Sequence, residues 1–124
     1  IEAMQEVAGL MHGVREAALA QGLPVDTLIA EAAPSQFEIN LFHQDDALRA
    51  CDHALLLKRA IKGVARGQGR LASFMAKPFG DLAGNGMHIH FSLVDASGRN
   101  VFDDDTDQGS ELLRHAVAGC HDLF

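Results

Sequence analysis

The chain has 124 residues and a mass of 13.3 kDa, about the size of one ordinary domain, which excludes a multidomain architecture. Hydrophobic residues make up 48% of it and charged residues 22%, so it can build a core and is neither disordered nor fibrous. The net charge of −7 argues against nucleic acid or an anionic membrane as a partner, and no stretch is apolar enough to span a bilayer. We therefore expect a soluble, cytoplasmic protein.

The first third of the sequence predicts a helix followed by a pair of strands. Over residues 2–21, apolar positions recur at three- and four-residue steps with charged residues between them, the pattern of an amphipathic helix. Gly22 is expected to end this helix, and Leu23-Pro24 to prevent its continuation. Residues 27–43 read as extended chain with a break at Pro34-Ser35, which predicts two short strands around a turn.

A second helix is predicted to run to Gly67, because Asp45 and Asp46 suit its N-terminus and basic residues crowd its C-terminal half. A strand over residues 71–76 follows it. The two cysteines of the chain are expected to be buried thiols rather than a disulfide. The predicted buried stripe of the helix consists of Ala47, Leu48, Cys51, Leu55 and Ile61.

The last third predicts one more strand and a helix. Apolar and polar residues alternate cleanly over residues 87–94, a hairpin-type turn follows at residues 96–100, and a helix begins near Ser110. We expect the strands of residues 27–43, 71–76 and 87–94 to form one antiparallel sheet with helices on its apolar face. The predicted fold class is therefore α+β.

Two pairs of side chains could carry chemistry. His88 and His90 share one face of the predicted strand, which suits ligation of one metal, separate roles at one site, or a solvated face without function. Glu31 and Glu38 bracket the Pro34-Ser35 turn and can converge on a hard divalent cation such as Mg²⁺ or Mn²⁺. Their apolar neighbours favour the cation, because a carboxylate among such residues is costly unless it is paired or metal-bound.

A glycine-rich segment at residues 77–86 is a further candidate. Its glycines let the backbone approach a ligand closely, and Lys77 can answer a phosphate charge. It is neither a Walker A loop nor a dinucleotide fingerprint, since it enters a strand and lacks their spacing. The acidic run at residues 103–107 is not a calcium loop, because Gln108 replaces the required glycine and Arg114 the final glutamate.

Taken in this order, the segments resemble the catalytic domain of the glutamine synthetase family over about residues 23–104. The stretch from Glu31 to Glu38 is similar to the family's strand motif, in which two glutamates flank Ala-Pro-Gly/Ser-Gln. The glycine segment fits the family's ATP-region signature, which runs from Lys77-Pro78 through residues 83–86 to His88 and Ser92.

The resemblance implies roles for individual residues. Glu31 and Glu38 would ligate one of two divalent cations, Mg²⁺ or Mn²⁺, and His88 would ligate the second, which bridges the ATP phosphates. His90 would be the catalytic residue in contact with the transferring phosphoryl group and the nucleotide, and the Gly84 backbone would bind glutamate. Two further side chains would contact the nucleotide, those of Lys77 and Ser92.

The implied activity is ATP-dependent ligation, in which the γ-carboxylate of glutamate takes the γ-phosphoryl group and an amine then displaces the phosphate. Ammonia-using members usually carry Asn where this chain has Ala83, so the resemblance points to the γ-glutamylpolyamine (putrescine) synthetase branch. The alternatives are an ammonia-using glutamine synthetase and a non-catalytic structural or binding member. An unrelated histidine–metal hydrolase would need a general base, and the sequence offers none.

The resemblance also implies that residues 1–124 are a single partial catalytic domain. The family's N-terminal β-domain and the C-terminal part of its catalytic domain have no counterpart in these residues. In the family the active site forms between subunits of a ring. We therefore expect a homo-oligomeric parent protein that acts on glutamate and an amine, and an isolated chain without activity.

Overall fold

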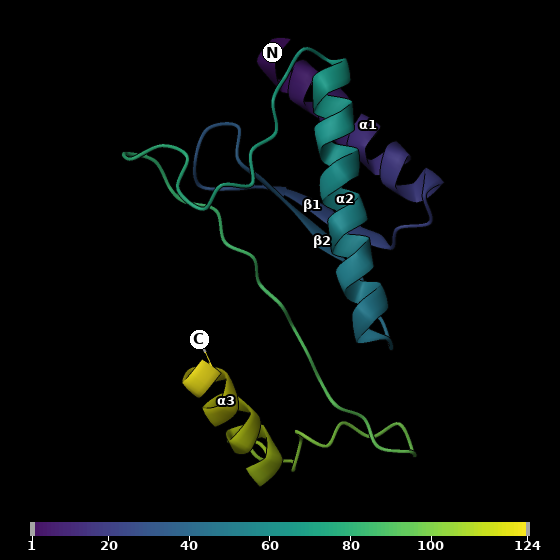
Figure 1. The fold of residues 1–124 in the computed structure, drawn as a ribbon, viewed down its shortest axis with the longest axis vertical. Coiled ribbons are helices and arrows are strands. Elements are labelled where there is room, and N and C mark those ends of the chain that lie inside the picture. The colour runs from purple at the N-terminus through teal and green to yellow at the C-terminus, as the bar shows by residue number, and fades with distance from the viewer. Residues whose placement is uncertain (1, 124) are drawn as a thin grey trace. The chain divides into compact units, whose positions relative to one another are not determined.

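The computed structural model describes residues 2–123, with side chains from residue 7 onward. The chain divides into two compact units at Gly86. The first contains α1 (Glu2–Ala20), β1 (Val25–Ala30), β2 (Phe37–Leu41) and α2 (Ala47–Gly67), and the second contains α3 (Glu111–Leu123) (Figure 1). Helices combined with an antiparallel strand pair confirm the predicted α+β class. None of the helices between residues 2 and 123 combines the length and apolarity that a membrane crossing requires.

The end of α1 determines where the hairpin begins. Gly22 has a φ of 71°, its N–H donates to the carbonyl of Leu19 at 2.9 Å, and the N–H of Leu23 donates to the carbonyl of Ala18 at 3.0 Å. This pair of bonds is a Schellman motif, and Leu23, which is 2% exposed, joins Ala18 in the core. The predicted stop at Gly22 is confirmed.

β1 and β2 form a two-stranded antiparallel sheet around the turn at residues 31–36, as predicted. Leu28 lies opposite Ile39 and Ala30 opposite Phe37. Because side chains alternate along a strand and paired residues share a face, Leu28 and Ile39 lie on the same face of the hairpin. They pack against a core that the hairpin shares with α1 and α2, formed by Ala18, Leu23, Val25 and Leu57.

The face that α2 turns inward differs from the predicted one. Its buried residues are Leu57, Ala60 and Ala65, whereas Leu48 is 79% and Leu55 67% exposed. Ala47 and Cys51 are exposed as well, and within the predicted stripe only Ile61 packs against the core. Continued at steps of three and four residues, the predicted stripe includes Lys58 and Lys62. Burying that face of α2 would therefore bury two ammonium groups.

Small residues let α1 and α2 approach each other closely. A Cβ atom on Gly13 would lie 3.1 Å from Cγ1 of Val64, so the Val64 side chain would have to move by a few tenths of an ångström to admit an alanine there. The two cysteines, Cys51 and Cys120, are both exposed, so the prediction of buried thiols is wrong.

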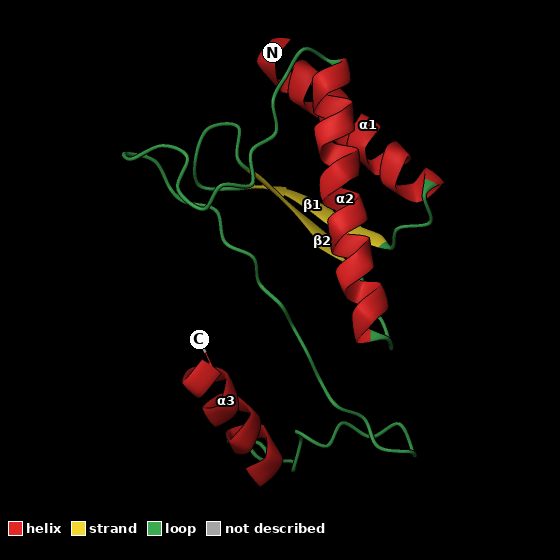
Figure 2. Cartoon of the chain, in the orientation of Figure 1, coloured by secondary structure: helices red, strands yellow, loops and turns green. Residues whose placement is uncertain are grey.

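Two predicted strands are absent from residues 2–123. Residues 71–76 and 87–93 lack regular secondary structure, and Val94 forms only an isolated antiparallel bridge with Asn100. These residues belong to the irregular segments drawn in green in Figure 2. A strand needs a neighbour for its backbone N–H and C=O groups, and neither segment has a partner strand among the described residues. The predicted single sheet is therefore reduced to the β1–β2 hairpin.

The second unit is built around Phe102, which is 6% exposed. Its ring meets that of Phe91 edge to face, with centroids 5.9 Å apart.

The predicted turn at residues 96–100 is confirmed, because Val94 before it forms an antiparallel bridge with Asn100 at its end. Asp95 lies just before this turn, and hydrogen bonds, first of all from the Ser97 hydroxyl, lower the pKa of its carboxyl. Ser110 caps α3, since its hydroxyl accepts from the N–H of Leu113 at 3.2 Å.

Asp46 caps α2 and provides a test of this fold. Its Oδ1 accepts from the backbone N–H groups of Leu48 at 2.9 Å and Arg49 at 3.2 Å. We expect Asp46→Ala to lower the free energy of unfolding by about 1 kcal/mol in urea denaturation, because both N–H groups lose their acceptor. The matched control is Asp45→Ala, since the neighbouring carboxylate accepts no such bond from a described residue. Equal losses for the two variants would contradict the capping role.

Candidate active site

Glu31 and Glu38 lie on the open face of the hairpin. Glu38 is opposite Ile29, and Glu31 continues the pairing just beyond β1, where its N–H donates to the carbonyl of Gln36 at 2.9 Å. Both residues are therefore on the face opposite to that of Leu28. In a regular antiparallel pair, the arrangement that this register continues, diagonal neighbours have Cβ atoms about 7 Å apart. Glu31 is exposed and Glu38 half-buried, so the predicted cost of apolar surroundings is small.

The turn between the two glutamates is held by its own hydrogen bonds. The N–H of Gln36 donates to the carbonyl of Ala33 at 3.1 Å, and the N–H of Ala33 donates to the side-chain Oε1 of Gln36 at 3.0 Å. Ser35 takes a φ of 59°, the left-handed conformation that a tight reversal requires. This geometry fixes the backbone at both ends of the bent segment, from which the two glutamate side chains extend.

The glycine-rich segment forms a loop over residues 75–85. Its two ends meet at a neck formed by Met75, Ala76 and Asn85. Asn85 donates from its backbone N–H to the carbonyl of Ala76 at 2.8 Å and from its Nδ2 to the carbonyl of Met75 at 2.7 Å. Lys77 Nζ donates to the carbonyl of Leu82 within the loop. An ammonium has three protons, so Lys77 keeps donors for another partner.

Gly84 is required by the closed neck of this loop. A Cβ atom at this position would lie 2.7 Å from the carbonyl oxygen of Ala76, which is closer than atoms can approach. Its backbone is exposed, as the predicted contact with a substrate demands.

Gln36 joins the turn to the loop. Its Nε2 donates to the carbonyl of Gly84 at 2.8 Å and to Oδ1 of Asn85 at 2.9 Å. The structure thus brings together the predicted site residues of the first unit at one end of the hairpin: Glu31, Glu38, Lys77 and Gly84. The sequence places Gln36 and Asn85 inside motifs but gives them no role. Gln36 is separated from Gly84 by 48 positions and from Asn85 by 49, and no spacing rule links residues so far apart in the chain.

Three further candidates, His88, His90 and Ser92, belong to the unit that begins at Met87. His88, His90 and Ser92 are exposed, and the irregular backbone there does not confirm the strand face on which they were predicted. Their approach to Glu31 and Glu38 stays a prediction.

Glu31 and Glu38 fit a hard divalent cation as two of its ligands. Carboxylate oxygens are the donors that Mg²⁺ and Mn²⁺ take, and neither glutamate is in an ion pair with any residue whose side chain is described. No cluster of three or more His, Cys, Asp or Glu side chains between residues 7 and 123 could hold a metal ion by itself. Two carboxylates therefore supply part of a coordination shell, which water or further groups would complete.

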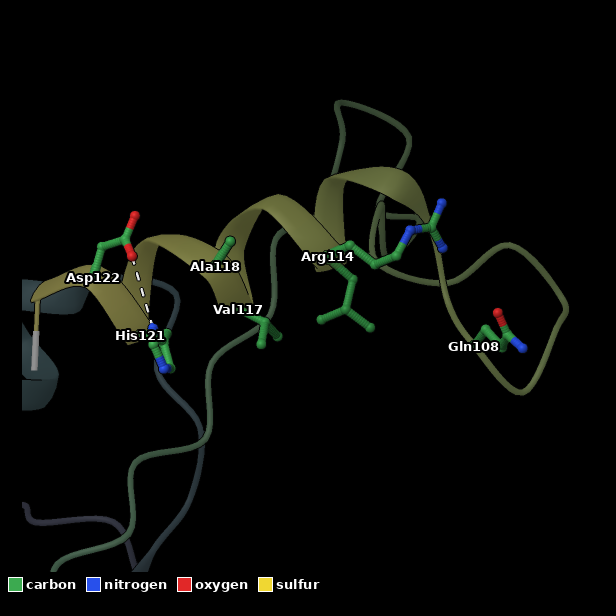
Figure 3. Close-up of a pocket in the computed structure, with 7 residues that line it drawn as sticks. Gln108, Arg114, Val117, Ala118, His121 and Asp122 are labelled. Carbon is green, nitrogen blue, oxygen red and sulfur yellow. Dashed lines mark ion pairs between the residues drawn. The ribbon is translucent and has the colours of Figure 1, made fainter.

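Two surface hollows are not lined by predicted site residues. One runs along α2 beside Lys58, Arg59, Lys62 and Arg66. In the other, shown in Figure 3, Nδ1 of His121 lies 3.7 Å from Oδ1 of Asp122. That hollow is lined by Gln108, Leu113, Arg114, Val117, Ala118, His121 and Asp122.

An open carboxylate pair beside a backbone loop is an arrangement for binding a cation and a small polar substrate. The model of the glutamine synthetase catalytic domain matches residues 1–124, so the chain belongs to the glutamine synthetase family. It is 43% identical to the gamma-glutamylputrescine synthetase of Escherichia coli over the whole chain, which covers 26% of that protein. It is 40% identical to the glutamine synthetase of Thermotoga maritima over 99 residues, 79% of this chain and 22% of that protein.

The fold agrees with a solved member of the family. A structure of GmaS without ligand matches 95% of this chain and 28% of its own with a TM-score of 0.81 and 32% sequence identity. The chain spans about a quarter of the length of the relatives it matches.

The fit of Gly84 can be tested by adding one methyl group. We expect Gly84→Ala to lower the free energy of unfolding by about 1–3 kcal/mol in urea denaturation, because the new Cβ collides with the carbonyl of Ala76. Gly80→Ala is the matched control, since a Cβ atom there meets nothing within 4 Å, and we expect it to change stability by less than about 0.5 kcal/mol. Equal stability of the two variants would contradict the closed loop.

Proposed function

We propose that this chain is part of the catalytic domain of a ligase that joins the γ-carboxylate of glutamate to an amine with ATP. Family membership defines a glutamine synthetase-like catalytic domain. The observation that carries the proposal is the junction at Gln36, which holds the loop of Gly84 beside the turn flanked by Glu31 and Glu38. A cation and a substrate bound at these two elements would be neighbours, as the reaction requires.

In this proposal each candidate residue has one task. Glu31 and Glu38 hold one divalent cation, and the Gly84 backbone binds glutamate. His88 would ligate a second cation, which would offset charge on the ATP phosphates, and His90 would contact the phosphoryl group in transfer. Two side chains complete the nucleotide contacts, Lys77 and Ser92. The cations, Mg²⁺ or Mn²⁺, would offset the negative charge by which a carboxylate and a triphosphate repel each other.

The reaction proceeds by two displacements. An oxygen of the γ-carboxylate bonds to the γ-phosphorus while the bond to the bridging oxygen of ADP breaks, giving γ-glutamyl phosphate and ADP. The amine nitrogen then bonds to the acyl carbon, inorganic phosphate leaves with the electron pair of the C–O bond, and the nitrogen releases a proton. The phosphoryl group serves to turn a poor leaving oxygen into a good one.

We propose a polyamine such as putrescine as the amine. The similarity to gamma-glutamylputrescine synthetase extends over the whole chain, and Ala83 stands where ammonia-using members usually carry Asn. The alternative of an ammonia-using enzyme is supported by the 40% identity to a glutamine synthetase. A non-catalytic structural or binding member is the third possibility, and the presence of Glu31, Glu38, His88 and His90 speaks against it.

We also propose how this chain fits into the full-length protein. Residues 1–124 would be one partial catalytic domain of a cytoplasmic homo-oligomer, a ring in which neighbouring subunits complete each active site. The isolated chain would then lack catalytic parts and have no activity.

The choice of amine can be tested with the full-length protein. We expect phosphate release from ATP and glutamate with putrescine, at a kcat/KM at least about tenfold above that with ammonia or a monoamine, because the second amino group adds binding contacts. The 124-residue chain is the control without turnover. Phosphate release with ammonia alone would defeat the polyamine preference, and none with any amine would favour the non-catalytic alternative.

The cation site can be tested separately from turnover. We expect Glu31→Gln and Glu38→Gln each to weaken Mn²⁺ binding to the full-length protein by at least about tenfold in calorimetric titration, because each removes a charged oxygen ligand. Glu16→Gln is the control, since Glu16 is an exposed carboxylate of α1 whose close cation is Arg15 at 3.9 Å. Unchanged Mn²⁺ affinity in both hairpin variants would exclude these ligands.

A further inference from the structure

Gln36 is the residue through which the hairpin holds the glycine loop. Its side chain makes three hydrogen bonds: Oε1 accepts within the turn from the N–H of Ala33, and Nε2 donates to Gly84 and Asn85 across the junction. Within the described part of the chain, both hydrogen bonds that connect the loop to the hairpin come from this one amide.

The hydrogen bonds at this junction have a fixed direction. The N–H of Ala33 donates to Gln36, Gln36 donates to Oδ1 of Asn85, and Nδ2 of Asn85 donates to the carbonyl of Met75. Turning either amide over would set donor against donor and acceptor against acceptor. This series of hydrogen bonds therefore fixes the orientation of the Gln36 and Asn85 side chains and the position of the Gly84 carbonyl.

The loop needs this support because its apolar side chains do not hold it. Phe79 is 64% and Leu82 38% exposed, so little buried surface fixes the loop against the hairpin. A loop fixed in advance does not lose its conformational freedom when the substrate binds, which favours binding. Loss of the junction would transfer that cost to the substrate.

We propose that Gln36 is a positioning residue for glutamate, which holds the Gly84 loop in its binding conformation through the two bonds donated by Nε2. This role rests on the proposed function, since it requires that the loop binds glutamate. It separates two neighbouring tasks: Glu31 and Glu38 serve the cation, whereas Gln36 serves the amino acid.

The decisive variant is Gln36→Glu in the full-length protein. A carboxylate keeps the acceptor for Ala33 and so preserves the turn, but it cannot donate to Gly84 or Asn85. We expect the KM for glutamate to rise about ten- to a hundredfold, while the KM for ATP stays within about twofold of the wild type and Mn²⁺ binding does not weaken. The matched control is Gln44→Glu, because among the described residues Nε2 of Gln44 donates only to the nearby carbonyls of Phe42 and His43.

Each outcome decides the matter. A wild-type KM for glutamate in Gln36→Glu overturns the positioning role and leaves the proposed function standing. Equal losses of glutamate, ATP and Mn²⁺ binding show a general structural role and overturn it too. No turnover by the wild-type protein overturns the proposed function and this role together. Thermal melting checks folding, and if Gln36→Glu does not fold, Gln36→Ala replaces it with the same expected change in the KM for glutamate.

Discussion

The arrangement of the first unit depends on which face of the β1–β2 hairpin packs against the helices. Leu28 and Ile39 share one face and meet a core to which α1 and α2 contribute Ala18 and Leu57. Because a strand exposes alternate residues on opposite faces, this packing leaves the other face open, and Glu31 and Glu38 lie there. A register shift of one strand by one residue would turn the carboxylate of that strand inward and its apolar residue outward.

The junction at Gln36 builds on that choice. With the register set, the turn of residues 31–36 stands at the end of the hairpin, and its glutamine reaches the neck of the closed loop at Gly84. Two hydrogen bonds from Gln36, rather than a large buried surface, therefore hold the loop in place. In our proposal this places the parts for the cation and for glutamate side by side. Of the proposed nucleotide contacts, Lys77 belongs to the same unit, whereas His88, His90 and Ser92 belong to the unit from Met87 onward.

Several elements could be predicted because their signals are local. The stop of α1 at Gly22, the turn at Pro34-Ser35 and the helix after Ser110 depend on backbone conformation and caps within a few residues. The strands at residues 71–76 and 87–94 could not be predicted correctly, because alternation shows that a segment can pair but not that a partner strand is present.

The amino-acid sequence by itself determined the family, the glutamates at both ends of a turn and the glycine that the loop requires, since each of these is a pattern of neighbouring residues. Tertiary structure alone decided that α2 buries Leu57 and Ala60 rather than Leu48 and Leu55, and that Gln36 meets Asn85. The physical reason is the same in both cases. Which of two apolar faces is buried, and which distant amide completes a hydrogen bond, depends on what the rest of the chain places against them.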